Sequence, residues 1–83
     1  MNAIMAKRKL NPWTPAKIRE LGDALAERFD WTQTDMAEEI GVGQGVWSAW
    51  QSGKRKPSRQ SLILLDFLNA KLGTGKVTFP KKK

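Results

Sequence analysis

The sequence contains no cysteine and no histidine. The chain can therefore form no disulfide, no thiolate or imidazole metal site, and no nucleophile activated by histidine. Carboxylates, lysines and hydroxyls are the catalytic groups that remain, and a chain of 83 residues has little room to shape a cleft around them. We therefore expect no enzymatic activity and no cofactor.

Long apolar runs are also missing. Residues 1–10 have no apolar core of the kind that a signal peptide needs, and no apolar run is longer than four residues, as at 62–65. A membrane-spanning helix needs about 20 such residues. The sequence predicts a cytoplasmic protein with no membrane partner, and the lack of cysteine fits a reducing compartment.

The residues that are present indicate one small folded domain with excess positive charge. Lys and Arg number 15 against 8 Asp and Glu, so the net charge is +7. A hydrophobic content of 40% with four tryptophans favours a folded core over a disordered basic tail. Cations are concentrated in residues 1–11, 54–61 and 62–83, whereas residues 12–53 are mildly acidic. This distribution places positive charge at both termini and in one internal turn, where it can contact phosphate groups or simply increase solubility.

Start and stop signals predict four helices. Thr14-Pro15 begins a helix over 15–29, and Thr32 begins one over 32–40, with Asp35 completing a near capping box. Glycines end this second helix and a third over 44–52, and a fourth follows over 58–73. We expect an N-terminal arm at 1–11, a helical domain at 12–73 and a C-terminal tail at 74–83. Within the tail, residues 77–79 are typical of a short strand or an extended segment.

The third predicted helix has two different sides. Val46, Trp47 and Trp50 share one side, and the residues on the other side are all uncharged. Two short helices joined by a glycine turn in a basic helical chain are a candidate helix-turn-helix motif. The cationic cluster 54–56 directly follows the second of these helices. An uncharged polar face beside cations suits the major groove of DNA and its phosphate walls.

The residues of this region resemble a known family. WTQTDMAEEIGV at 31–42 is similar to the opening of the Cro/lambda-repressor type (XRE-like) helix-turn-helix, an apolar residue followed by T-Q-x-x-L-A-x-x-(L/I)-G-(V/I). VWSAWQSGKRKP at 46–57 resembles the family's T-I-S-x-W-E-x-G-K-x-x-P. The resemblance is close over 31–57 and loose over 58–69. It implies an all-α, lambda-repressor-like domain of about four to five helices. It also implies a prokaryotic or phage regulator, most simply a nucleoid-associated repressor, that binds duplex DNA sequence-specifically.

The resemblance also implies a set of site residues. The base-reading positions are Gln44, Gly45, Ser48 and Ala49. The phosphate-binding positions are Thr32, Gln33, Gln51, Lys54, Arg55 and Lys56, with Lys7, Arg8 and Lys9 of the arm. Gln33 matches a glutamine that binds phosphate or buttresses a base-reading side chain. The chain departs from the pattern at Gly45 and Ala49, which have no hydrogen-bonding side chain, and at Trp47, where isoleucine or valine is usual. Specificity then depends on Gln44, Ser48, the arm and DNA shape.

Several alternatives remain open at this stage. The tryptophans are expected in the core rather than as stacking platforms for single strands, with Trp13 at the core's edge. The apolar surplus over 62–68 indicates a homodimer formed by the fourth helix and the tail, or burial of that helix by the other three. The functional alternatives are an antitoxin that holds a toxin and binds its own operator, an RNA or single-strand binder, and a DNA-bending accessory protein. Without a further domain, we expect no small-molecule effector.

Overall fold

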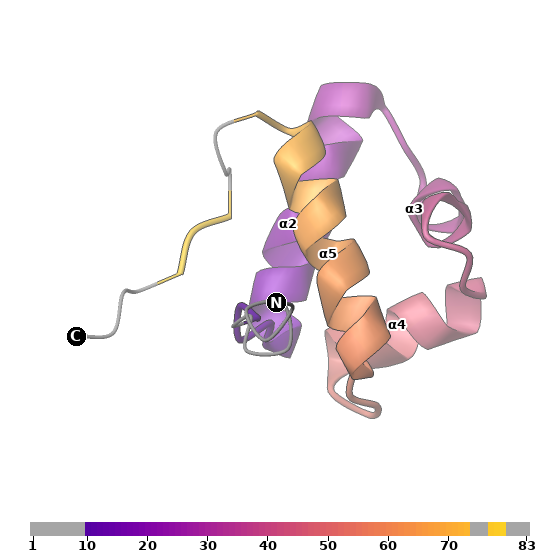
Figure 1. Ribbon diagram of the computed structural model, residues 1–83. Coiled ribbons are helices and arrows are strands. Elements are labelled where there is room, and N and C mark those ends of the chain that lie inside the picture. Colours follow the sequence, from indigo (N-terminus) through magenta and orange to yellow (C-terminus); the bar gives the residue numbers. More distant parts are fainter. Residues whose placement is uncertain (1–9, 74–76, 80–83) are drawn as a thin grey trace, which may run out of the picture.

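The computed structural model describes residues 10–73 and 77–79, and these residues form an all-helical fold (Figure 1). The helices are α2 (Pro15–Phe29), α3 (Gln33–Glu39), α4 (Gln44–Ser52) and α5 (Arg59–Lys71). The predicted all-α class and the four predicted helices are confirmed, with boundaries within two residues of those expected. Within the described ranges, none of the helices has the length and apolar character that crossing a bilayer would require.

The helices begin and end at the residues that the sequence signals indicated. Lys17 donates its backbone N–H to the Thr14 hydroxyl over 3.2 Å, and α2 ends at Asp30 in the left-handed conformation, with φ 62°. At α3 the capping box is complete, because Thr32 and Asp35 each accept a backbone N–H of the other. Local capping therefore positions the two ends at which α2 passes into α3.

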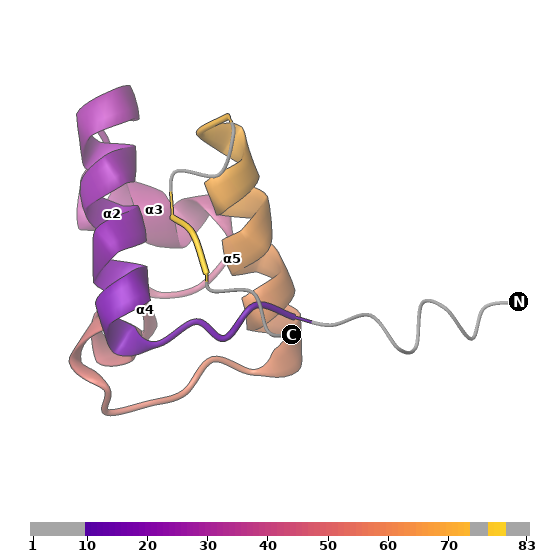
Figure 2. The same ribbon diagram turned by 90° about the vertical axis from the view of Figure 1, so that its left-hand side faces the viewer.

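The core is built from all four helices, with α2 and α5 on either side of segment 77–79 (Figure 2) and the shorter helices α3 and α4 closing one flank (Figure 1). The largest fully buried side chains are Ile18, Leu21, Leu25, Met36, Trp47, Leu65, Leu68 and Val77. Trp47 and Trp50 point inward, as predicted, and Trp13 is also buried. Trp31 is only partly buried and stacks on Phe29, with their ring centroids 4.9 Å apart.

The extended segment 77–79 belongs to this core. It lies between α2 and α5 (Figure 2), and Val77 is 2% exposed. The Asn69 side chain donates to the Val77 carbonyl over 2.9 Å and accepts the Val77 N–H over 3.1 Å. Phe79 meets the Trp13 ring edge-on at 4.8 Å. The sequence assigned these residues to a tail because three residues show no periodicity, although a polar Asn69 on an apolar helix face was a usable signal.

Candidate nucleic-acid interface

A short turn joins α3 to α4 and sets the direction in which α4 leaves the core. Gly41 has φ 74°, a conformation that favours glycine, and the backbone N–H of Val42 returns to the Ala37 carbonyl over 3.0 Å. Gly43 then begins α4 without a side-chain cap. The backbone N–H groups of Gln44 and Gly45 are therefore available to an external acceptor, whereas that of Val46 donates to the Gly43 carbonyl over 3.1 Å.

A tryptophan–glutamine hydrogen bond ties α4 to the start of α3. The Trp47 indole Nε1–H donates to the Gln33 Oε1 over 2.7 Å, and Trp47 itself is fully buried. Because the carbonyl oxygen of the Gln33 amide is used inward, its amide nitrogen remains as a donor on an exposed residue. The departure from the family pattern at Trp47 thus supplies a bond that isoleucine or valine could not make.

The outer face of α4 contains small or polar side chains without charge. Gln44, Gly45 and Ser48 are exposed, and Ala49 is half-buried. A Cβ added at Gly45 would meet no atom within 4 Å, so this part of the helix backbone borders open space. The structure therefore brings the four predicted base-reading residues together on one accessible helix.

Gln51 has different surroundings from those the sequence predicted. Its side-chain amide lies against α2, since a Cβ built on Gly22 would come within 3.1 Å of the Gln51 Nε2. The backbone carbonyl of Gln51 accepts a hydrogen bond from the Arg19 guanidinium. Gly22, which weakens α2 intrinsically, here leaves the space that Gln51 occupies. Gln51 thus joins α4 to α2, and the predicted phosphate contact is not favoured by this position.

The turn after α4 presents three exposed cations, Lys54, Arg55 and Lys56. The backbone N–H groups of Lys54 and Arg55 both donate to the Ala49 carbonyl, over 3.0 and 3.3 Å. The ion pairs found among residues 10–73 and 77–79 are Lys17–Glu20 and Lys71–Glu39, and neither involves this turn. The three cations are held beside the end of α4 without a carboxylate partner in the described part of the chain. The predicted arm contacts Lys7, Arg8 and Lys9 lie outside the described residues.

Replacing Gly45 by alanine should stabilise the fold by roughly 0.5–1 kcal/mol. The added methyl group enters open space in the folded protein. In the unfolded chain, alanine has fewer backbone conformations than glycine, so folding loses less entropy. Urea unfolding monitored by circular dichroism measures the change. Gly41→Ala is the matched control and should destabilise, since its φ of 74° disfavours a side chain. A loss of stability for Gly45→Ala would show that this face of α4 is not open.

Comparisons of the chain with protein-family models, with curated proteins and with solved structures find no match. Any functional proposal therefore rests on the residues and their geometry alone. Within the described ranges, no three acidic side chains gather closely enough to hold a metal ion.

Proposed function

We propose that the chain is a sequence-specific duplex-DNA-binding regulator, most simply a repressor, in which α3 and α4 form a helix-turn-helix motif. The observation that supports this best is the uncharged, exposed outer face of α4 beside three cations at 54–56, which have no carboxylate partner among the described residues. Major grooves present hydrogen-bonding base edges between two phosphate walls. A polar helix face with cations at one end is complementary to that surface.

The proposed division of work follows from the side chains. Gln44, in the first turn of α4, can make a bidentate contact with the N6 and N7 of an adenine. Ser48 lies one turn further along the same face, and Ala49 can contact a thymine methyl group. Gly45 lets the helix backbone approach the groove closely. Few side chains read bases directly, so DNA shape is expected to contribute to specificity.

In this proposal the phosphate contacts come from the start of α3 and from both ends of α4. The amide nitrogen of Gln33 and the backbone N–H groups of Gln44 and Gly45 at the start of α4 are neutral donors. Lys54, Arg55 and Lys56 supply positive charge at the opposite end of α4. These groups orient the motif on the duplex without selecting a sequence.

Measurements on two substitutions test this division. Gln44→Ala should weaken binding to the preferred duplex by about 5- to 150-fold, equivalent to roughly 1–3 kcal/mol, with little effect on unrelated DNA. Lys54→Ala should weaken binding to the preferred duplex and to unrelated duplexes equally. It should also lower the slope of log K against log salt by about 1. Fluorescence anisotropy gives the dissociation constant of each variant for the preferred duplex and for an unrelated duplex, to be compared with the wild-type values. Equal losses on both duplexes for Gln44→Ala would contradict base reading by this residue.

We further propose that α5 forms a twofold dimer interface. Phe67 is 67% exposed and borders an apolar groove of about 450 Å³. The groove is lined by Glu39, Ile40, Leu64, Phe67, Leu68, Ala70 and Lys71. Because Glu39 and Lys71 pair with each other over 3.4 Å within one copy, the patch has no unbalanced charge that would repel the same patch on a second copy. Two copies suit a palindromic site with half-sites about 34 Å apart.

Phe67→Glu should convert the dimer to a monomer, because it places a carboxylate in the apolar contact. Sedimentation velocity measures the change, and binding to the palindromic site should become weaker and lose cooperativity. Gln60→Glu makes the same change in charge from a neutral residue at an exposed position of the same helix. A Phe67→Glu protein that sediments as the same dimer as the wild type, or a wild-type protein that does not dimerise, would contradict this interface.

A further inference from the structure

The segment that precedes α2 is fastened to the middle of α5 through one carboxylate. Asp66 Oδ1 accepts a hydrogen bond from Asn11 Nδ2 and another from Trp13 Nε1, each over 2.8 Å. The backbone N–H of Trp13 also donates to the Asn11 carbonyl over 2.9 Å, which holds the two donors together as a pair. Asp66 therefore fixes the point at which the N-terminal part of the chain joins the folded domain.

Segment 77–79 covers the Trp13 ring from another direction. Phe79 meets this ring edge-on, with the ring centroids 4.8 Å apart, and Lys17 Nζ donates to the Thr78 carbonyl over 2.7 Å. Trp13 is 6% exposed, so its ring belongs to the core and its indole N–H needs an acceptor inside the protein. Loss of the Asp66 acceptor would leave this N–H without a partner, which favours detachment of the segment before α2.

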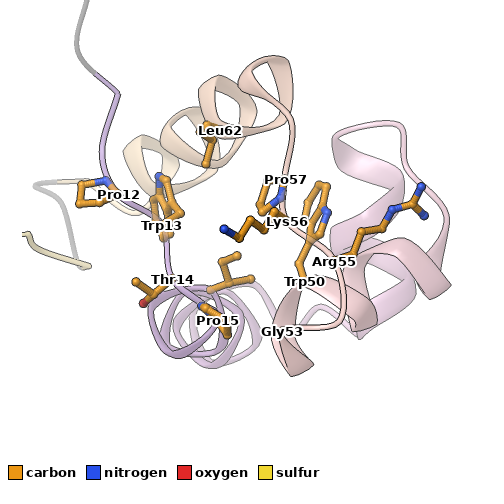
Figure 3. Close-up of a pocket in the computed structure, with 11 residues that line it drawn as sticks. Pro12, Trp13, Thr14, Pro15, Trp50, Gly53, Arg55, Lys56, Pro57 and Leu62 are labelled. Carbon is orange, nitrogen blue, oxygen red and sulfur yellow. The ribbon is translucent and has the colours of Figure 1, made fainter.

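The anchored segment lies beside the cationic turn that follows α4. Residues 12–15 line the same hollow as Gly53 and residues 55–57, and Figure 3 shows the two stretches of chain facing each other across it. A Cβ built on Gly53 would lie 3.5 Å from Pro15 Cγ, so the two stretches approach closely. The N-terminal part of the chain thus enters the domain on the flank that carries the cations at 54–56.

Covalent geometry limits how far the N-terminal cations can lie from this anchor. An extended chain spans at most about 3.6 Å per residue, so the Cα atoms of Lys9 and Lys7 lie within about 7 Å and 14 Å of the Asn11 Cα. Lys7, Arg8 and Lys9 are therefore tethered to the same flank as the cationic turn. Their charges add to those of the turn in attracting phosphate groups there.

We infer that Asp66 is a positioning residue for DNA binding, although its own charge repels DNA. By holding Asn11 and Trp13, it fixes the end of the N-terminal arm, so that Lys7, Arg8 and Lys9 reach phosphate groups next to those bound by the turn at 54–56. Without this anchor, DNA binding has to order a longer stretch of free chain, which lowers affinity. The inference rests on the proposed function, since it gives a role in DNA binding to a residue that does not contact DNA.

Two substitutions with the same net charge separate the anchor from electrostatics. Asp66→Ala and Asp66→Asn each remove one negative charge, but the asparagine Oδ1 can still accept both hydrogen bonds. In anisotropy titrations of the full chain, Asp66→Ala should bind the preferred duplex roughly 5- to 30-fold more weakly than Asp66→Asn, the factor for ordering about one more backbone residue. Asp66→Asn should bind at least as tightly as the wild type, because a repulsive charge is gone.

Neutralising the arm tests whether Asp66 acts through it. In a background that carries Lys7→Gln, Arg8→Gln and Lys9→Gln, the Asp66→Ala and Asp66→Asn proteins should bind with equal affinity. An unchanged ratio between them in this background would show that Asp66 acts through the fold and not through the arm. That result would overturn the inference, as would equal affinity of the two Asp66 variants when the arm is intact.

The anchor itself is measured without DNA. In ¹H–¹⁵N spectra, the Trp13 indole N–H should exchange with solvent slowly in the wild type and in Asp66→Asn, and at least roughly tenfold faster in Asp66→Ala. The Trp47 indole N–H, bonded to Gln33, should keep its wild-type rate and so report an intact fold. Slow exchange at Trp13 in Asp66→Ala would exclude the anchor. An intact anchor in a wild-type protein that binds no duplex would instead contradict the proposed function, so the two failures are distinguishable.

Discussion

Trp47→Ala should destabilise the fold by about 3–5 kcal/mol, the largest effect expected of any single substitution in α4. Trp47 is fully buried, packs against Trp50, and donates its indole N–H to Gln33. The substitution leaves a cavity between α4 and the rest of the core and frees the start of α3. Small domains have only about 5 kcal/mol or slightly more to lose, so a large unfolded population is expected at 25 °C.

Thermal and urea unfolding, both monitored by circular dichroism, measure this loss. The midpoint temperature should fall by at least about 12 °C, given roughly 4–8 °C for each kcal/mol in a domain of this size. Ser48→Ala, the exposed neighbour on α4, should change stability by less than about 0.5 kcal/mol. If the Trp47→Ala protein unfolded at the same midpoint temperature as the wild type, α4 would not pack on the core through this residue.

Trp47→Phe separates the hydrogen bond from the packing. Phenylalanine retains much of the buried ring but cannot donate to Gln33 Oε1. It should therefore cost less stability than alanine and still weaken DNA binding, because the Gln33 amide is no longer oriented. A double-mutant cycle with Gln33→Ala isolates that coupling.

The triple substitution Lys54→Gln, Arg55→Gln and Lys56→Gln should reduce duplex affinity by on the order of a hundred- to a thousandfold at about 0.1 M salt. The three cations are exposed and without carboxylate partners in the described part of the chain, so their neutralisation changes phosphate binding more than folding. The slope of log K against log salt should fall by about 0.9 for each phosphate that is no longer neutralised. Anisotropy titrations over a range of salt concentrations give both quantities.

The control for this triple variant removes the same charge elsewhere. Lys81→Gln, Lys82→Gln and Lys83→Gln together also lower the net charge by three, at positions to which the proposal assigns no DNA contact. Its affinity should fall much less, through the long-range field alone. Equal losses in the two triple variants would assign DNA binding to net charge and contradict a localised interface at residues 54–56.

Features with local causes were predictable from the sequence. The starts of α2 and α3 follow from Thr14, Pro15, Thr32 and Asp35, whose capping interactions involve residues no more than four apart. The inward side of α4 follows from the spacing of Trp47 and Trp50. The grouping of Gln44, Gly45 and Ser48 on one exposed face follows from the same helical period.

Features that depend on distant parts of the chain were not predictable. The pairing of Asn69 with Val77 and the position of Gln51 over Gly22 arise from packing between separate elements. The hollow beside the turn after α4 joins residues 12–18 to residues 50–62, and no local pattern indicates that these segments meet.

Selection from a randomised pool of duplexes at moderate salt, followed by sequencing, tests the central claim most directly. A dimer that reads bases through α4 should enrich a palindromic motif with half-sites about one helical turn apart. Single-stranded DNA and RNA should compete poorly for the selected complex. Recovery of the pool without enrichment, with binding that depends only on salt, would contradict sequence-specific recognition by Gln44 and its neighbours on α4.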